Sequence, residues 1–159
     1  MDGSGPDHGR SEVYAAELAA FEGTELEVVE PFEVMSAFAR SLVTGAWWPA
    51  GPVVVRRTRP DARTSTTRAG AARRVAEVRL SGPQCTRATV VHELAHVLAG
   101  PAVGHGPAFR RAHVDIATVA FGAERAGWLA DAYAASRLSP GARAWPEPSA
   151  GGPGHVIAL

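Results

Sequence analysis

The chain has 159 residues, 46% hydrophobic and 20% charged, a composition typical of one compact domain. Sixteen basic residues balance sixteen acidic ones, and no apolar run is long enough for a signal peptide or a spanning helix, so we expect a cytoplasmic protein with no membrane partner. A single cysteine, Cys85, excludes an internal disulfide and a cysteine-based zinc ribbon.

We expect one domain over residues 11–138, between tails at residues 1–10 and 139–159. The second tail is dense in proline and glycine, which disfavour regular elements. Within the domain, every charge from Ser11 to Ala39 is acidic, whereas Arg56–Arg87 carries nine arginines and two acids. The two segments can neutralise each other across the fold, or Arg56–Arg87 can form a basic groove for nucleic acid or an acidic protein.

Apolar periodicity predicts two helices in the first third of the chain, over residues 11–21 and 31–44. The second helix carries Val34, Phe38 and Leu42 on one stripe, and a proline stands in its first turn, where a missing N–H costs nothing.

Two β-branched runs, Val53–Val55 and Val75–Leu80, predict strands. The second run alternates in polarity, so we expect one face in solvent and an edge position where an extended substrate could pair. The polar stretch between the runs, residues 58–71, is either a hairpin loop or a flap over a site. Three further helices are predicted, over residues 86–99, 107–121 and 123–137.

The motif His-Glu-Leu-Ala-His occupies residues 92–96. His92 and His96 stand one helical turn apart, so both imidazoles can reach one ion, while Glu93 lies about 100° around the helix and can border the ion without binding it. An apolar stripe runs nearly opposite the two histidines: Val90, Leu94, Val97 and Leu98. We expect this helix to pack on that stripe and to present the histidines on its other face.

A catalytic zinc usually has three protein ligands, so a third ligand is required. His105 is the leading candidate, because the chain can turn through glycines after the motif and deliver it just before Pro107 begins the next helix. Glu124, at the start of the last predicted helix, and His113, inside the helix before it, are the alternatives.

The stretch Val91–Arg111, VHELAHVLAGPAVGHGPAFRR, resembles the core of SprT-like zinc metalloproteases, the group that includes Spartan. In that group a Gly-His-Gly-Pro turn follows the motif helix and supplies the third histidine. The resemblance implies Zn²⁺ as cofactor and Phe109 as a packing residue. It assigns the zinc ligands and the general base to His92, His96, His105 and Glu93.

The chain also resembles a family of small bacterial metallohydrolases, in which a Val-Tyr-Ala-Ala-Glu segment, here residues 13–17, precedes the motif. The agreement is looser and extends over residues 11–120. Both resemblances imply a small zincin-like α+β domain, with a short mixed sheet packed on the motif helix and on flanking helices. Cleavage of DNA–protein crosslinks does not carry over, because the chain lacks a cysteine-rich ribbon.

The leading hypothesis is a zinc-dependent metallohydrolase that cleaves peptide bonds in a peptide or protein substrate, with Glu93 as general base toward a zinc-activated water. Candidate donors to the oxyanion are His113, Arg110 and Tyr133. In a second hypothesis the chain resembles the peptidases that cleave phage-type repressors, and Glu124 is the third ligand. In a third, a metal-stabilised module without turnover binds nucleic acid or an acidic protein through Arg56–Arg87. The sequence leaves the substrate's identity and the oligomeric state open.

Overall fold

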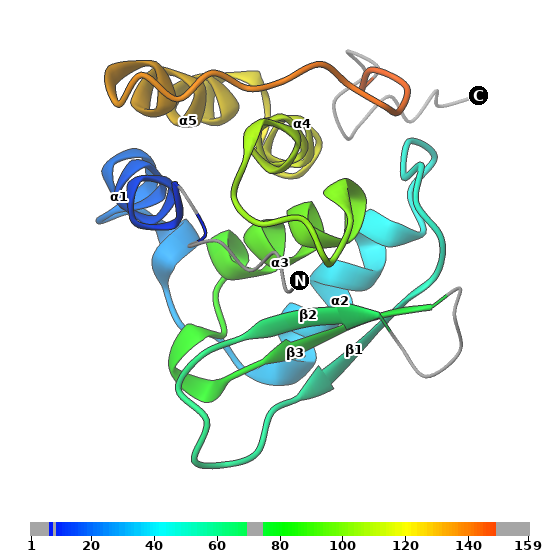
Figure 1. Ribbon diagram of the computed structural model, residues 1–159. Helices are drawn as coiled ribbons and strands as arrows, with labels where there is room; N and C mark the ends of the chain where they lie inside the picture. The colour runs from blue at the N-terminus through cyan, green and yellow to red at the C-terminus, as the bar shows by residue number, and fades with distance from the viewer. Residues whose placement is uncertain (1–6, 8, 70–74, 149–159) are drawn as a thin grey trace, which may run out of the picture.

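A computed structural model describes residues 7, 9–69 and 75–148 of the chain. These residues form an α+β domain of five α-helices and a three-stranded mixed sheet (Figure 1). The helices are α1 (Arg10–Phe21), α2 (Phe32–Val43), α3 (Arg87–Ala99), α4 (Pro107–Phe121) and α5 (Ala123–Ala135). The strands are β1 (Val53–Arg57), β2 (Thr66–Ala69) and β3 (Ala76–Leu80). Each helix begins and ends within two residues of its predicted bounds.

The sheet has the order β1-β3-β2, with β1 parallel and β2 antiparallel to β3. The prediction of an edge position for Val75–Leu80 is therefore wrong, because β3 is the central strand. The edge beside α3 is β2, which lies inside the polar stretch that was expected to be a loop or a flap. Its residues lack an apolar alternation and become a strand through pairing with β3, where Thr67 stands opposite Val78.

Helix α3 lies at the centre of the domain (Figure 1). The sheet and α2 contact one side of it, and α4 packs on the other side, with α5 and α1 beyond. In the apolar stripe Val90 and Leu94 are buried, whereas Val97 and Leu98 are half-buried. The first two motif residues, His92 and Glu93, are buried as well. The face of α3 that carries the histidines also packs, because Phe109 of α4 lies against His92 and His96. No helix in the described ranges is long and apolar enough to cross a membrane.

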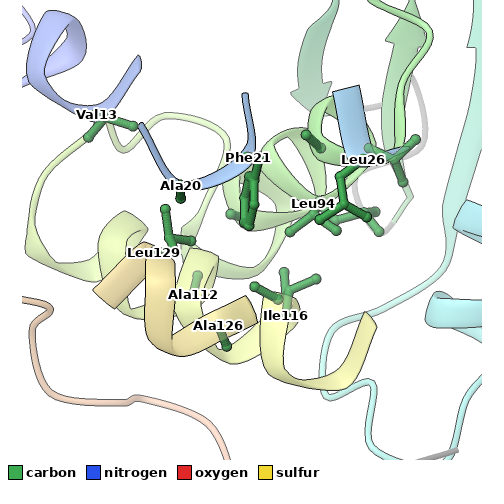
Figure 2. Packing of buried hydrophobic residues seen from close by; sticks show 14 of the residues in the cluster. Val13, Ala20, Phe21, Leu26, Leu94, Ala112, Ile116, Ala126 and Leu129 are labelled. Carbon is green, nitrogen blue, oxygen red and sulfur yellow. The ribbon is translucent and has the colours of Figure 1, made fainter. Parts of the chain in front are cut away.

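The hydrophobic core lies between α3, α4, α5 and the end of α1 (Figure 2). Phe21 and Leu94 are fully buried there, together with Ile116 of α4. Helix α2 contributes Met35 and Ala39 as its buried residues, whereas Val34 is 40% exposed. Phe38 and Leu42 of the predicted stripe are half-buried and pack against the core, so of that stripe only Val34 is exposed.

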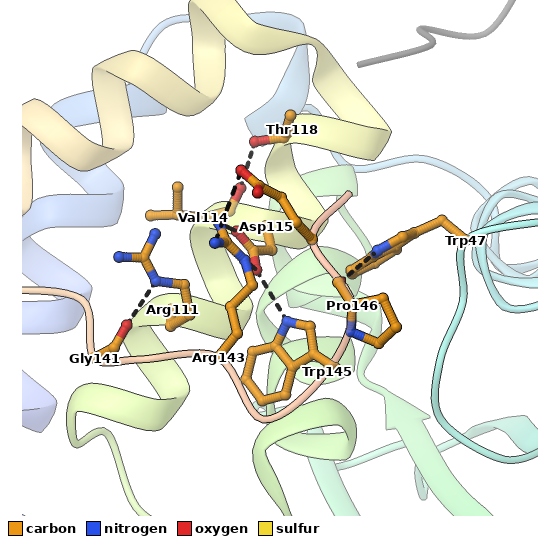
Figure 3. Close-up of polar contacts among 10 residues, drawn as sticks. Trp47, Arg111, Val114, Asp115, Thr118, Gly141, Arg143, Trp145 and Pro146 are labelled. Atoms are coloured by element: carbon orange, nitrogen blue, oxygen red, sulfur yellow. Dashed lines mark hydrogen bonds and ion pairs between the residues drawn. The ribbon is translucent and has the colours of Figure 1, made fainter. Parts of the chain in front are cut away.

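Residues 139–148 form no helix or strand, yet they are bound along α4 (Figure 3). The buried Asp115 carboxylate accepts two hydrogen bonds from Arg143, at 2.7 and 2.9 Å, and a third from Trp145 Nε1 at 2.9 Å. Gly141 N donates to Pro107 O, 2.9 Å away. Side-chain and backbone bonds to α4 thus replace the regular pairing that a proline- and glycine-rich segment cannot form.

We expect Asp115→Asn to lower the free energy of unfolding by about 2 kcal/mol, because it removes the charge that accepts the paired hydrogen bonds of Arg143. Urea unfolding followed by circular dichroism measures the change. Asp131→Asn is the matched control, since Asp131 is exposed. An equal, small loss in both variants would show that the segment contributes little to stability.

Candidate metal centre

The structure brings together three histidines of the predicted site. His92 and His96 come from consecutive turns of α3, and His105 comes from the loop between α3 and α4. One ring nitrogen of each lies within 4.8 Å of the other two. His92 and His105 are buried, whereas His96 is half-buried.

The loop that delivers His105 follows from its glycines and proline. Gly100 ends α3 with φ of 113°, a conformation that side chains disfavour, and so reverses the chain. Pro107 then begins α4 immediately after the turn. Arg110 Nη1, one turn into α4, donates to His105 O at 3.0 Å and fixes the backbone of the loop.

Two carboxylates orient two of the imidazoles. His92 Nδ1 donates to Glu17 Oε2 of α1 at 3.1 Å, and His105 Nδ1 donates to Asp7 Oδ2 at 2.6 Å. Asp7 Oδ1 also accepts the backbone N–H of His105 at 2.9 Å. Burial favours protonation of both carboxyls, but the hydrogen bonds and charges of the histidines outweigh it and lower the pKa of Glu17 and of Asp7. Each carboxylate therefore accepts a hydrogen bond from Nδ1–H and leaves the lone pair of Nε2 to face the site.

The two oriented Nε2 atoms, of His92 and His105, lie 3.3 Å apart. With both Nδ1 atoms protonated, their lone pairs point at one position, and only a shared proton or a cation between them removes the repulsion. Two nitrogen ligands at about 2.0–2.1 Å from a tetrahedral zinc are themselves about 3.3–3.4 Å apart. The observed separation therefore fits a zinc ion, and His96 supplies the third imidazole.

The protonation of these histidines also suits a metal. Burial, with the charges of His92 and His105, lowers the pKa of His96 to about 3, so its ring is neutral near pH 7. Burial likewise lowers the pKa of His105, against the opposing effect of Asp7. Burial by itself would lower the pKa of His92, but the Glu17 carboxylate outweighs this effect, so the pKa of His92 is raised. A metal would displace the extra proton that Glu17 favours on His92.

Glu93 follows His92 on α3. In the described residues two groups of side chains could hold a metal, the three histidines and a second group of Glu17, His92 and His113, and Glu93 belongs to neither. The Thr67 hydroxyl, from β2, lies 2.6 Å from Glu93 Oε2 and 3.0 Å from Glu93 O. Glu93 is 5% exposed, and burial raises the pKa of its carboxyl. A carboxylate with a raised pKa, held by one hydroxyl, can exchange a proton with a neighbouring water more readily than an exposed one.

Neither alternative third ligand joins the group of three histidines, although His113 forms a second group with Glu17 and His92, whose ligand atoms also lie within 4.8 Å of one another. Glu124 is exposed in the first turn of α5 and joins no metal-binding group in the described ranges. His113 is fully buried behind His92, with Nδ1 2.6 Å from the Tyr133 hydroxyl and Nε2 3.7 Å from Glu17 Oε1. Burial lowers the pKa of His113 to about 3, although Glu17 opposes this. Glu17 thus lies between two imidazoles and connects the candidate ligand His92 to a buried polar pair.

The three residues suggested as oxyanion donors already have other partners. Arg110 donates to His105 O and to Ser139 O, each at 3.0 Å. Tyr133 and His113 contact each other and are fully buried. These three residues therefore stabilise the loop and the helices around the histidines through the contacts they already make.

Aromatic rings enclose the histidines on two sides. Phe109 is fully buried, with its ring centroid 4.5–5.0 Å from those of His92, His96 and His105, which confirms its predicted packing role. Tyr14 stacks on His92 at 5.0 Å and remains 41% exposed.

Sequence reasoning did not assign four neighbours of the site: Asp7, Tyr14, Glu17 and Thr67. Asp7 falls in the predicted N-terminal tail, and Thr67 falls in the polar stretch that was not expected to be a strand. Tyr14 and Glu17 belong to the Val-Tyr-Ala-Ala-Glu segment, so the resemblance to small metallohydrolases was the available signal for them.

No protein-family model, curated protein or solved structure matches the chain.

We expect about one zinc per chain in the wild type and a large loss of zinc in His105→Ala, because two histidines alone leave the ion weakly held. Elemental analysis of protein purified without chelator and dialysed against zinc measures this. Glu124→Ala is the control and should retain the metal. The reverse pattern would make Glu124 the third ligand, and absence of zinc from the wild type would contradict a metal centre.

We expect Asp7→Ala to weaken zinc binding about 10- to 100-fold, the usual effect of removing a carboxylate that orients a ligating histidine. Competition with a chromophoric chelator measures the affinity, and Asp61→Ala, in an exposed loop, is the control. Gly104→Ala should act in the same direction, because its Cβ would lie 2.5 Å from Asp7 Oδ1. Unchanged affinity in Asp7→Ala would show that Asp7 does not position His105.

Proposed function

We propose that this protein is a zinc-dependent metallohydrolase of the SprT-like type that cleaves peptide bonds. The observation that carries the proposal is the 3.3 Å separation of two carboxylate-oriented Nε2 atoms, of His92 and His105, beside Glu93. His96 completes a set of three imidazoles. Imidazole ligands suit zinc as well as copper, nickel and iron, and we propose zinc, for which a three-histidine set leaves one position for water or substrate.

When bound, zinc would lower the pKa of a water molecule and polarise the carbonyl of the substrate. Glu93 would take a proton from that water and pass it to the leaving amine. Thr67 keeps the Glu93 carboxylate on the side of the helix that faces β2, through its bond to Oε2. Glu17 and Asp7 hold the ligating imidazoles in the tautomer that a metal requires.

The position of β2 favours a peptide as substrate. β2 pairs with β3 on one side, and in the described part of the chain no strand pairs with its other side. Thr67 of this strand contacts Glu93 directly, so the edge runs past the general base. An extended peptide could add to this edge through backbone hydrogen bonds and so place a carbonyl near the three histidines.

The rival interpretation, a module that binds nucleic acid through Arg56–Arg87, has less support. Glu77 forms ion pairs with three arginines of that segment, and Glu30 and Glu33 of the acidic segment pair with two more. Five of the nine arginines therefore have carboxylate partners, three of them within their own segment and two across to the acidic segment. Two others, Arg73 and Arg74, lie outside the described residues.

We expect Glu93→Gln to abolish peptide hydrolysis while zinc remains bound, because glutamine keeps the shape of glutamate but cannot accept a proton. Cleavage of a mixed peptide library by the zinc-loaded protein, read by mass spectrometry, measures activity, and elemental analysis measures zinc. Glu22→Gln, at an exposed position after α1, is the control. Hydrolysis that persists in Glu93→Gln would contradict the role of Glu93, and no cleavage by the wild type would contradict the peptidase.

A further inference from the structure

A cavity of about 300 Å³ lies between α1, the short 3-10 helix Glu25–Glu27 and the beginning of α3. Its lining is chemically mixed. Tyr14 and Leu18 form an apolar wall, Glu17 and Glu27 contribute carboxylates, and Thr89 and Gln84 contribute neutral polar groups.

This cavity adjoins the candidate metal centre. Tyr14 lines it, and the same ring stacks on His92 and lies 5.7 Å from His105, measured between ring centroids. Thr89 stands one helical turn before Glu93 on α3, so the cavity continues along the helix from the general base.

The cavity also adjoins the edge strand. The side-chain oxygen of Gln84 accepts the backbone N–H of Ser65, which directly precedes β2, at 2.6 Å. A peptide that paired with β2 would therefore pass this cavity within one or two residues of the carbonyl at the metal, and one of its side chains could enter.

The two carboxylates of the cavity differ in their partners. Glu17 is bonded to His92, so its charge is already compensated. Glu27 is half-buried, and within the described residues its side chain forms no hydrogen bond or ion pair with another group. Burial, with the nearby charge of Glu17, raises the pKa of Glu27, and a cation in the cavity would relieve both effects. The apolar wall is accessible, since Tyr14 is 41% and Leu18 51% exposed.

We propose that this cavity is a subsite for an arginine or lysine side chain of the peptide substrate, a proposal that rests on the proposed peptidase function. The methylene stem would lie along Tyr14 and Leu18, and the cationic group would bind the Glu27 carboxylate. Arginine and lysine side chains combine an apolar stem with a cationic end group, and this cavity combines an apolar wall with one carboxylate that has no cationic partner in the described residues.

Binding of peptide hydroxamates to the zinc-loaded full chain tests the subsite without requiring turnover. The series carries arginine, or its uncharged isostere citrulline, at each of the two positions on either side of the chelating group. We expect arginine to bind at least about tenfold more tightly than citrulline at one of these positions, as measured by calorimetry. Glu27→Gln should abolish that preference, and the matched control Glu22→Gln should retain it.

The outcomes separate the two proposals. Equal affinity for arginine and citrulline at every position, or a preference that survives in Glu27→Gln, overturns the subsite, even if the wild type cleaves peptides. An arginine preference that depends on Glu27, in a protein that cleaves no peptide, supports the subsite and contradicts the peptidase function. Failure of every hydroxamate to bind the zinc-loaded protein overturns both.

Discussion

His92 Nε2 and His105 Nε2 lie 3.3 Å apart inside the protein, and much of the surrounding structure serves to keep them there. Two imidazole lone pairs at that distance need a cation or a proton between them, so their approach has to be stabilised from outside. Glu17 and Asp7 fix the rings by holding the opposite nitrogen of each, and the Glu17 carboxylate raises the pKa of His92, which favours a proton between the two Nε2 atoms. Phe109 adds steric support, since its buried ring contacts both imidazoles.

Two buried polar side chains on the otherwise apolar face of α3 explain why the neighbouring elements are arranged as they are. Buried polar groups need partners, and α3 brings two into the core, His92 and Glu93. Helix α1 supplies a carboxylate to the first, and β2 supplies a hydroxyl to the second. Behind them α4 and α5 add the pair His113 and Tyr133, which extends the polar contacts through the core to Glu17. The catalytic proposal and the packing of the domain therefore depend on the same contacts.

Local patterns predicted the helices well and the sheet less well. The bounds of α3 and α4 follow from apolar periodicity and from Gly100 and Pro107, all of which act within a few residues. β2 escaped prediction because its residues, TTRA, carry no alternation, and their pairing with β3 creates the strand. The same pairing makes β3 the central strand. The edge position that was expected for Val75–Leu80 therefore belongs to β2.

The sequence by itself determined the three histidines and the glutamate, because their relation is local. His92, Glu93 and His96 share one helix with a fixed turn, and a glycine-rich loop of seven residues brings His105 back to it. Only the tertiary structure decided which groups orient them. Glu17 and Asp7 lie 75 and 98 residues from the histidines they bind, so no spacing rule connects them. Their positions depend on how α1 packs against the rest of the domain, and that depends on the free energy of the whole core rather than on any segment of the chain.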